Sequence, residues 1–461
     1  MKNFKNIKNV YFLGIGGIGM SALARYFKFR GCNVAGYDRT PTELTNAMQN
    51  EGINIHFEDD IRNIPKNWNP AETLAVFTPA IPDDNSELSW FREKPIGLLK
   101  RAKVLGMICN EKNGIAVSGT HGKTTVSTMT ATILNETPTG CGAFLGGISK
   151  NFGSNLLLPK DVSAWVVVEA DEFDRSFLHL QPQLALITSI DADHLDIYGD
   201  HEKIMEAFEK FISQIKKDGK LLIKKGVEID TKKTKAEIFS YSLNDDADFT
   251  TLNLRLDTNS SCYCFDLKTP GGIIPDFKMN YPGLINVENA VGAASLAFLA
   301  GVQADDIKAG IEKYLGVERR FDVRFKNEKY IYIDDYAHHP KELEAVITSV
   351  KALYPNRKVT GIFQPHLYSR TRDFAAEFAE SLDLLDTAIL LPLYPAREEP
   401  IKRVSSETIF KLMKSENKKL ATWEQTLELL KNEEPDLILT MGAGNIDRMA
   451  VQIIEILKNK N

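Results

Sequence analysis

The chain has 461 residues, 43% of them hydrophobic and 26% charged, with a net charge of −6, which is typical of a soluble globular protein of about two to four domains. The negative charge argues against a nucleic-acid partner, and no apolar run approaches the roughly 18 residues that a membrane span needs. The five cysteines are scattered except for Cys262 and Cys264, so we expect no disulfide framework, no cysteine metal site and a cytoplasmic location, with the oligomeric state left open.

The first predicted segment, residues 1–110, begins with the pattern of a dinucleotide-binding fold. An apolar strand at 10–13, a helix at 20–30 and a second strand at 34–37 surround a G-x-G-x-x-G loop. Asp38 follows the second strand at the distance expected for an acid that binds a ribose hydroxyl. A later strand at 74–77 leads into Thr78. The glycines of the loop are Gly14, Gly16, Gly17 and Gly19.

The second predicted segment, residues 111–316, contains a phosphate-binding loop. An apolar strand at 115–118 precedes the loop, and a helix-compatible stretch at 126–134 follows it. Backbone N–H groups and the helix dipole favour polyphosphate there, Lys123 can reach the terminal phosphates, and the Thr124 hydroxyl can hold Mg²⁺. The loop is a G-T-x-G-K-T variant, and it predicts an ATP site. Its residues are Gly119, Thr120, His121, Gly122, Lys123, Thr124 and Thr125.

Acids and histidines follow two further strands of this segment, at 165–168 and 184–188. Glu169 and His194 end neighbouring strands beside the phosphate loop, so they are candidate ligands of a second metal position, although Glu169 could instead cap a helix. Short alternating runs at 237–243, 249–256 and 263–267 predict an antiparallel patch, and helices are expected at 287–299 and 304–314. Asn286 and Asn289 could read an adenine edge or act as simple caps.

The third predicted segment, residues 317–461, has strands at 330–333, 358–363, 387–391 and 437–441, which imply a doubly wound α/β sheet. Arg319 and Arg320 at its start could clamp phosphate, or could be a charged linker. His366, Arg370 and Arg372 follow the second strand and could hold a carboxylate, or could be solvated surface cations. Five of the eight histidines lie in polar segments after strands or in the phosphate loop, which favours a site: His121, His194, His338, His339 and His366.

The presence of two predicted nucleotide-binding loops on one α/β chain, at 14–19 and 119–125, has a chemical explanation. A carboxylate is a poor electrophile at neutral pH, but its acyl phosphate can be attacked by an amine. A three-domain α/β protein that consumes ATP to make an amide bond would employ all three segments. Closing such a site would limit competing hydrolysis of the acyl phosphate.

Motifs along nearly the whole chain resemble those of the Mur ligase family of peptidoglycan synthesis, in the family's order. They are GIGGIGM at 14–20, GTHGKTT at 119–125, EADE at 169–172, DADH at 191–194, DDYAHHP at 334–340, FQPH at 363–366 and YPAREE at 394–399. The resemblance implies an ATP-dependent amide ligase that uses Mg²⁺, or Mn²⁺ in its place. The lactyl carboxylate of UDP-N-acetylmuramate would take the γ-phosphoryl group, and the amine of L-alanine would then attack.

The resemblance also implies roles for individual residues. The UDP-sugar site would comprise Gly14, Gly16, Gly17, Gly19, Asp38, Thr78 and His121. The ATP site would comprise Gly119, Thr120, Gly122, Lys123, Thr124, Thr125, Asn286, Asn289, Arg320 and Asp335. The metal ligands would be Thr124, Glu169 and His194. The amino-acid site would comprise His338, His366, Arg370 and Arg372, and the catalytic residues would be Lys123, Glu169, His194, His338 and Arg370.

Three residues depart from the family pattern: Ile285 replaces a common histidine, Leu367 a common arginine and Asn445 a common aspartate. None of the three belongs to the phosphate loop. Three alternative functions remain open at this point. They are a ligase that attaches a recycled murein tripeptide to the same sugar nucleotide, an NAD-dependent oxidoreductase with a phosphate-loop domain, and a non-catalytic ATP-gated binding module.

Overall fold

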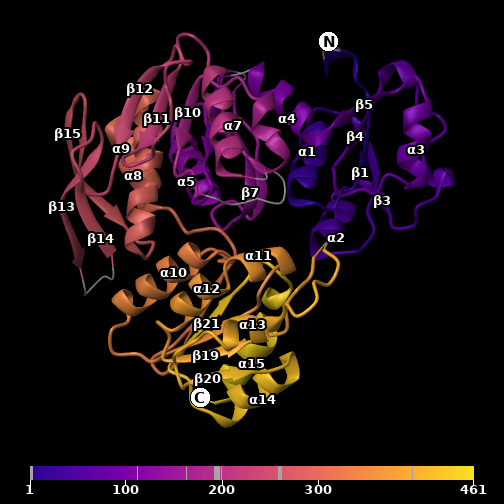
Figure 1. The fold of residues 1–461 in the computed structure, drawn as a ribbon. Helices are drawn as coiled ribbons and strands as arrows, with labels where there is room; N and C mark the ends of the chain where they lie inside the picture. The colour runs from indigo at the N-terminus through magenta and orange to yellow at the C-terminus, as the bar shows by residue number, and fades with distance from the viewer. Residues whose placement is uncertain are drawn as a thin grey trace. The chain divides into compact units, whose positions relative to one another are not determined.

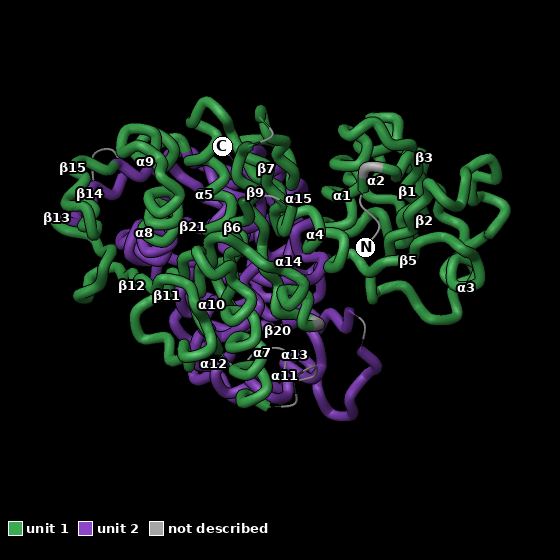
Figure 2. Tube along the Cα trace, turned by 90° about the horizontal axis from the view of Figure 1, so that it is seen from above, with its two compact units in different colours: residues 1–252, 266–277, 290–313 green, residues 253–265, 278–289, 314–461 purple. Residues whose placement is uncertain are grey.

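The structure is a computed structural model that describes residues 4–111, 113–161, 163–191, 198, 200–257, 262–396 and 398–460 (Figure 1). The chain forms two compact units (Figure 2). Unit 1 contains residues 1–252, 266–277 and 290–313, and unit 2 contains residues 253–265, 278–289 and 314–461. No helix among the described residues has both the length and the apolar character needed to cross a membrane.

The N-terminal part of unit 1 is a five-stranded parallel sheet in the order β3-β2-β1-β4-β5. This order has the central strand first in the chain, as in a nucleotide-binding fold. The strands are β1 (Asn9–Leu13), β2 (Asn33–Tyr37), β3 (Asn54–His56), β4 (Thr73–Phe77) and β5 (Gly97–Lys100). The helices are α1 (Ile18–Phe29), α2 (Glu43–Asn50), α3 (Ser86–Glu93) and α4 (Arg101–Asn110), with short 3₁₀ turns η1 (Phe4–Asn6), η2 (Ile61–Asn63) and η3 (Pro70–Glu72).

Strand β1 is buried on both faces, as expected for the centre of a parallel sheet. On one face, Val10 and Phe12 join the apolar core that includes α1. On the other face, Tyr11 and Leu13 join a cluster that includes Phe91 of α3. Successive side chains of a strand alternate between faces, so the two clusters come from one strand. The central strand thereby fixes the glycine loop at its end.

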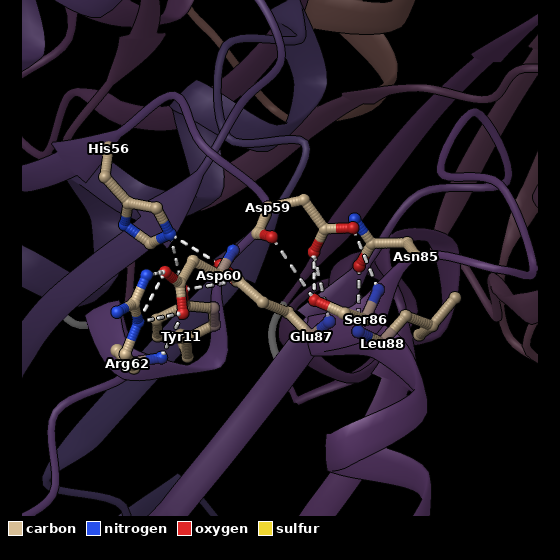
Figure 3. Close-up of polar contacts among 9 residues, drawn as sticks. All are labelled: Tyr11, His56, Asp59, Asp60, Arg62, Asn85, Ser86, Glu87 and Leu88. Atoms are coloured by element: carbon tan, nitrogen blue, oxygen red, sulfur yellow. Dashed lines mark hydrogen bonds and ion pairs between the residues drawn. The ribbon is translucent and has the colours of Figure 1, made fainter.

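A polar network centred on the buried Glu87 lies against the second face of this sheet (Figure 3). The Glu87 side chain is 0% exposed; it accepts a hydrogen bond from the Tyr11 hydroxyl at 2.6 Å, and its other oxygen lies 2.6 Å from His56 Nε2. Asp59 accepts hydrogen bonds from the first backbone N–H groups of α3 and so satisfies donors that the helix cannot. Burial, with the nearby Glu87 carboxylate, raises the pKa of Tyr11, so its hydroxyl remains a donor.

The central part of unit 1 is a seven-stranded sheet in the order β12-β11-β10-β6-β9-β7-β8, in which β8 pairs antiparallel with β7. The strands are β6 (Gly114–Ser118), β7 (Cys141–Ser149), β8 (Ser154–Leu157), β9 (Trp165–Glu169), β10 (Leu184–Ile187), β11 (Lys220–Lys224) and β12 (Glu237–Tyr241). The accompanying helices are α5 (Lys123–Glu136), η4 (Phe173–His179), α7 (His201–Ser213) and α9 (Ala304–Glu312). Helix α5 packs against α9 and the neighbouring strands.

One predicted element of the antiparallel patch was wrong. The run at 237–243 contributes β12, which pairs in parallel with β11 at the edge of the central sheet. Its alternating pattern reflects an edge strand with exposed residues, and such a pattern does not specify the partner strand. The other two runs belong to a separate three-stranded sheet in the order β13-β14-β15, formed by β13 (Thr250–Asp257), β14 (Cys262–Thr269) and β15 (Gly272–Met279). Helix α8 (Leu284–Leu299) follows this sheet.

The C-terminal part, in unit 2, is a six-stranded sheet in the order β16-β17-β21-β18-β19-β20, in which β16 pairs antiparallel with β17. The strands are β16 (Asp322–Lys326), β17 (Ile331–Asp335), β18 (Val359–Phe363), β19 (Thr387–Leu390), β20 (Lys418–Leu420) and β21 (Leu437–Met441). The helices are α10 (Pro340–Leu353), α11 (Tyr368–Asp373), α12 (Ala375–Leu382), α13 (Ser406–Phe410), α14 (Trp423–Asn432), η5 (Ile446–Met449) and α15 (Ala450–Asn459). The predicted α/β class is confirmed.

Candidate active site

The glycine loop after β1 packs closely against the ends of neighbouring strands. Gly14 has a φ of +85°, and a Cβ added there would lie 2.6 Å from the Thr78 side chain. The backbone N–H of Gly16 donates to the Asp38 carboxylate at 2.6 Å. Gly17 is the N-cap of α1, so the loop presents a helix N-terminus at the carboxyl edge of the sheet. This arrangement is suited to a diphosphate.

The phosphate loop has a conformation that requires its glycines. Gly122, the N-cap of α5, has a φ of +81°. Gly119 has a φ of +127°, and a Cβ there would lie 2.1 Å from the Thr188 hydroxyl. Position 119 therefore requires glycine, because the chain there passes close to the backbone and side chain just after β10 and leaves no room for a Cβ.

Hydrogen bonds tie the same loop to the segment after β10. The Thr120 and Ser189 hydroxyls lie 2.8 Å apart, and the backbone N–H of Asp191 donates to Thr120 at 3.1 Å. His121 Nε2 lies 3.4 Å from the Asp191 carboxylate. These contacts fix the side of the loop that faces β10. Ser189 was not singled out from the sequence, where a lone serine after a strand carries little signal.

Lys123, the first residue of α5, is held inside the loop. Its ammonium donates to the Gly119 carbonyl at 2.6 Å and to Glu172 at 2.9 Å. Burial by itself would lower the pKa of Lys123, but the carboxylates of Glu172, Asp171 and Glu169 raise that pKa above its ordinary value. The lysine is therefore charged, which fits its predicted role as a phosphate ligand.

Oxygen donors that could hold a divalent cation flank this lysine. Thr124 is only 7% exposed on the first turn of α5, and Glu169 is the last residue of β9. Gly146 leaves room for that carboxylate, since a Cβ at position 146 would lie 2.1 Å from Glu169 Oε2. A hydroxyl and a carboxylate are the hard ligands that Mg²⁺ prefers, so the residues fit this ion. The third predicted ligand, His194, lies outside the described residues.

Asn286 and Asn289 both lie on the first turns of α8 and are buried. The Asn286 amide donates to the Pro282 carbonyl at 2.6 Å, and the Asn289 amide donates to Asn286 Oδ1 at 3.3 Å. Ile285, where the family often has histidine, is 41% exposed. The two carboxamides are thus paired with each other, and their contact with adenine stays a prediction.

The linker before β16, residues 317–321, lies against the end of β17 in unit 2, where the Phe321 N–H donates to Asp335 and the Arg319 carbonyl accepts from Tyr336. Arg319 and Phe321 have positive φ values of 61° and 44°. The Arg319 guanidinium donates to the Gly442 carbonyl at 2.6 Å, so this arginine clamps the linker to its own unit. Arg320 lies over the Tyr336 ring, 5.0 Å from its centroid. Strained backbone of this kind persists only where the surroundings hold it in place.

Asp335, the last residue of β17, accepts the backbone N–H of Phe321 at 2.6 Å and that of Ala337 at 2.7 Å. Burial raises its pKa from 3.8 to about 6, although Arg320 and the two N–H groups oppose the shift. The unfolded chain releases this proton first as pH rises, so between pH 4 and 6 the folded state binds more protons.

The stability of unit 2 should therefore fall as pH rises through that window, by roughly 2 kcal/mol from this group. Urea unfolding of the wild type and of Asp335→Asn at pH 4.5 and pH 7 measures the effect. The loss of stability with pH should be smaller in the variant, whereas an identical loss in both proteins would contradict this account of Asp335.

The residues predicted to border the amino acid form a row of rings in unit 2. The His338 and His366 ring centroids lie 6.1 Å apart, and His366 stacks on Tyr394 at 5.9 Å. His338 Nδ1 lies 2.8 Å from the Tyr336 carbonyl, so a proton on Nδ1 would be donated to that oxygen. Tyr394 was part of a quoted motif but received no role from the sequence.

The two arginines of α11 differ in their surroundings. Arg370 is buried, with 7% exposure, whereas the Arg372 side chain is 54% exposed and paired with Asp373 at 2.6 Å. Leu367, at the position where the family often has arginine, is buried with a φ of +70°. Asn445 accepts a hydrogen bond from the Gln364 amide at 2.9 Å. The amino-acid-binding roles of both arginines stay predictions.

The candidate residues thus fall into two groups, each described within its own unit. In unit 1 lie Gly14, Gly16, Gly17, Gly19, Asp38, Thr78, Gly119, Thr120, His121, Gly122, Lys123, Thr124, Thr125 and Glu169. In unit 2 lie Asn286, Asn289, Arg320, Asp335, His338, His366, Arg370 and Arg372. The sequence reasoning missed the role of Glu172 as the partner of Lys123, although its place in an acidic run after a strand was a signal.

Three family models together match most of the chain. The N-terminal "Mur ligase family, catalytic domain" matches residues 9–113, the "Mur ligase middle domain" residues 117–297, and the "Mur ligase, glutamate ligase domain" residues 319–444. The second and third matched segments begin close to the phosphate loop and to the Arg319 linker, respectively.

Individual proteins show the same similarity over their full lengths. The UDP-N-acetylmuramate–L-alanine ligase of Parabacteroides distasonis is 49% identical over 458 residues, 99% of this chain and 98% of the relative. The solved UDP-N-acetylmuramate–alanine ligase of Thermotoga maritima has a TM-score of 0.81 at 25% identity, covering 98% of this chain and 100% of the other. A murein peptide ligase from Psychrobacter arcticus has a TM-score of 0.71 at 22% identity, covering 98% of this chain and 99% of the other.

Proposed function

The chain belongs to the Mur ligase family, and from this premise we infer that it is an ATP-dependent ligase that joins L-alanine to the lactyl carboxylate of UDP-N-acetylmuramate in peptidoglycan precursor synthesis. The observation that carries the assignment is the 49% identity over nearly the whole chain to a UDP-N-acetylmuramate–L-alanine ligase. Fold alone would not assign an activity, because one fold hosts many functions.

The chemistry follows from the weakness of a carboxylate as an electrophile. The γ-phosphoryl group passes from ATP to a lactyl carboxylate oxygen, which releases ADP and leaves an acyl phosphate. The alanine amine then attacks the acyl carbon, the C–N bond forms, and the C–O bond to phosphate breaks. Phosphoryl transfer depends mainly on positioning and on charge stabilisation, which is what a lysine-bearing phosphate loop supplies.

We assign the binding sites of the sugar nucleotide, Mg²⁺ and the amino acid by the side chains and backbone groups that each part of the chain presents. The loop after β1, with Asp38, would bind the diphosphate and ribose of the sugar nucleotide. Mg²⁺, held by Thr124, Glu169 and His194, would neutralise charge on the phosphates. His338, His366 and Arg370 would border the amino acid. The cytoplasm, which supplies ATP and keeps thiols such as these five free cysteines reduced, is the proposed compartment.

A phosphate-release assay tests the assignment and separates it from its rivals. ATP, Mg²⁺ and UDP-N-acetylmuramate are supplied with L-alanine, with each other amino acid singly, or with the murein tripeptide. We expect release only when the sugar nucleotide is present and highest with L-alanine. Preference for the tripeptide would favour the recycling ligase, and NAD(H) binding in place of the sugar nucleotide would favour an oxidoreductase.

A further inference from the structure

The ammonium group of Lys123 has an acceptor for each of its three N–H donors within the protein. It lies 2.6 Å from the Gly119 carbonyl, 3.4 Å from the Thr120 carbonyl and 2.9 Å from Glu172. A lysine has three donors and no acceptor, so its donors are fully used. A phosphate oxygen that binds this lysine must therefore displace one of these acceptors.

Glu172 is the acceptor that carries a full charge, and its side chain is 1% exposed. Its backbone is anchored: its carbonyl accepts the Tyr198 hydroxyl at 2.6 Å and the Arg175 backbone N–H at 2.9 Å. A carboxylate on a fixed backbone in the interior cannot simply turn to solvent when an anion arrives. Charge-assisted hydrogen bonds are also roughly twice as strong as neutral ones, so Glu172 holds Lys123 more firmly than either carbonyl does.

We propose that Glu172 is a positioning residue that holds Lys123 within the phosphate loop and competes with the phosphates of the nucleotide for this lysine. The proposal rests on the ATP-dependent function assigned above. The ion pair weakens nucleotide binding because the phosphates must share the lysine with a carboxylate. It also directs the remaining N–H groups of the ammonium, so losing the carboxylate loosens the lysine during phosphoryl transfer.

Glu172→Gln tests this division between binding and turnover. ADP binding is measured by calorimetric titration, with excess chelator present to exclude effects of metal ions. Glu172→Gln should bind ADP up to about tenfold more tightly than the wild type does, because the competing charge is gone. In the complete assay, kcat should fall by about tenfold, while the KM for ATP falls as well. A residue that only stabilises the fold would not tighten ADP binding. Glu111→Gln, which removes an exposed charge at the end of α4, is the matched control and should change neither value.

A second background identifies the route of the effect. In Lys123→Met, the Glu172→Gln change should no longer tighten ADP binding, because there is no lysine to release. The proposal would be overturned if Glu172→Gln still raised the affinity for ADP in the Lys123→Met background. It would also be overturned if Glu172→Gln alone bound ADP no more tightly than the wild type does. If Glu172→Gln does not fold, Glu172→Asp replaces it as the test, because its carboxylate is one methylene shorter. Glu172→Asp should tighten ADP binding by about twofold to threefold, and unchanged ADP binding would overturn the proposal.

The two levels of inference fail separately. If wild-type protein neither binds ADP nor releases phosphate when supplied with UDP-N-acetylmuramate and L-alanine, the proposed function is wrong. If the wild type does both and only the Glu172 variants behave as the control does, the function stands and the role of Glu172 is wrong.

Discussion

Lys123→Ala should lower the rate of phosphate release by roughly 100- to 1,000-fold, which is the usual loss when one donor to a developing charge is removed. The lysine begins α5, and its ammonium is the cation that the loop holds among its own carbonyls. Alanine keeps the helix and the glycine conformations but supplies no charge for the terminal phosphates. The measurement is the phosphate-release assay with both acceptor substrates at saturation.

Binding of UDP-N-acetylmuramate should survive the same substitution, since its proposed site is built mainly on the glycine loop after β1 and does not include Lys123. Lys123→Ala also leaves the buried Glu172 without its cation, so the double variant with Glu172→Gln restores neutrality. That double variant should be as stable as the wild type or nearly so, and still inactive. Turnover near the wild-type rate in either variant would show that the ATP site is misplaced.

Glu87→Ala should destabilise unit 1 by about 3–5 kcal/mol, the cost of leaving buried polar partners unpaired. The carboxylate is the shared acceptor of Tyr11 and His56 on the face of the sheet that α3 covers (Figure 3). Without it, the Tyr11 hydroxyl loses its strong acceptor in the core, and a cavity adds to the loss. Calorimetric unfolding at neutral pH should show a transition several degrees below that of the wild type.

Two further variants give this result its meaning. Glu93→Ala removes an exposed acid from the same helix and should change the free energy of unfolding by less than about 0.5 kcal/mol. Glu87→Gln keeps an oxygen for Tyr11 but removes the charge, so its loss should lie between those of the other two. Equal stabilities of Glu87→Ala and Glu93→Ala would mean that the network contributes little to folding.

Local patterns were sufficient wherever one short segment contains both the element and its chemistry. The run before Gly119 and the pair Lys123-Thr124 predicted a strand, a loop and a helix N-terminus, which are β6 and α5. The four apolar runs of the third segment likewise predicted β17, β18, β19 and β21. The strands β16 and β20 were missed, because both have mostly charged sequences and lie at the two edges of the sheet.

Contacts between distant segments could not be predicted in the same way. Strand β12 was expected in an antiparallel patch, but it completes the parallel sheet beside β11, because an alternating edge strand does not encode its neighbour. Glu172 is 49 positions from Lys123 in the chain, and the pairing of β6 with β9 brings the two side chains into contact. Leu367, where the family often has arginine, is a buried residue in a left-handed conformation at the start of α11, which the sequence did not predict.

The sequence by itself determined the α/β class, the two glycine loops and the ligase family, because hydrophobic period, glycine spacing and motif order are properties of contiguous residues. Only the tertiary structure decided which charged groups face one another: Lys123 with Glu172, Glu87 with Tyr11 and His56, and Asp335 with the linker backbone. The physical reason is that burial and partner distance set the strength of an electrostatic interaction, and neither quantity exists until separate strands have paired.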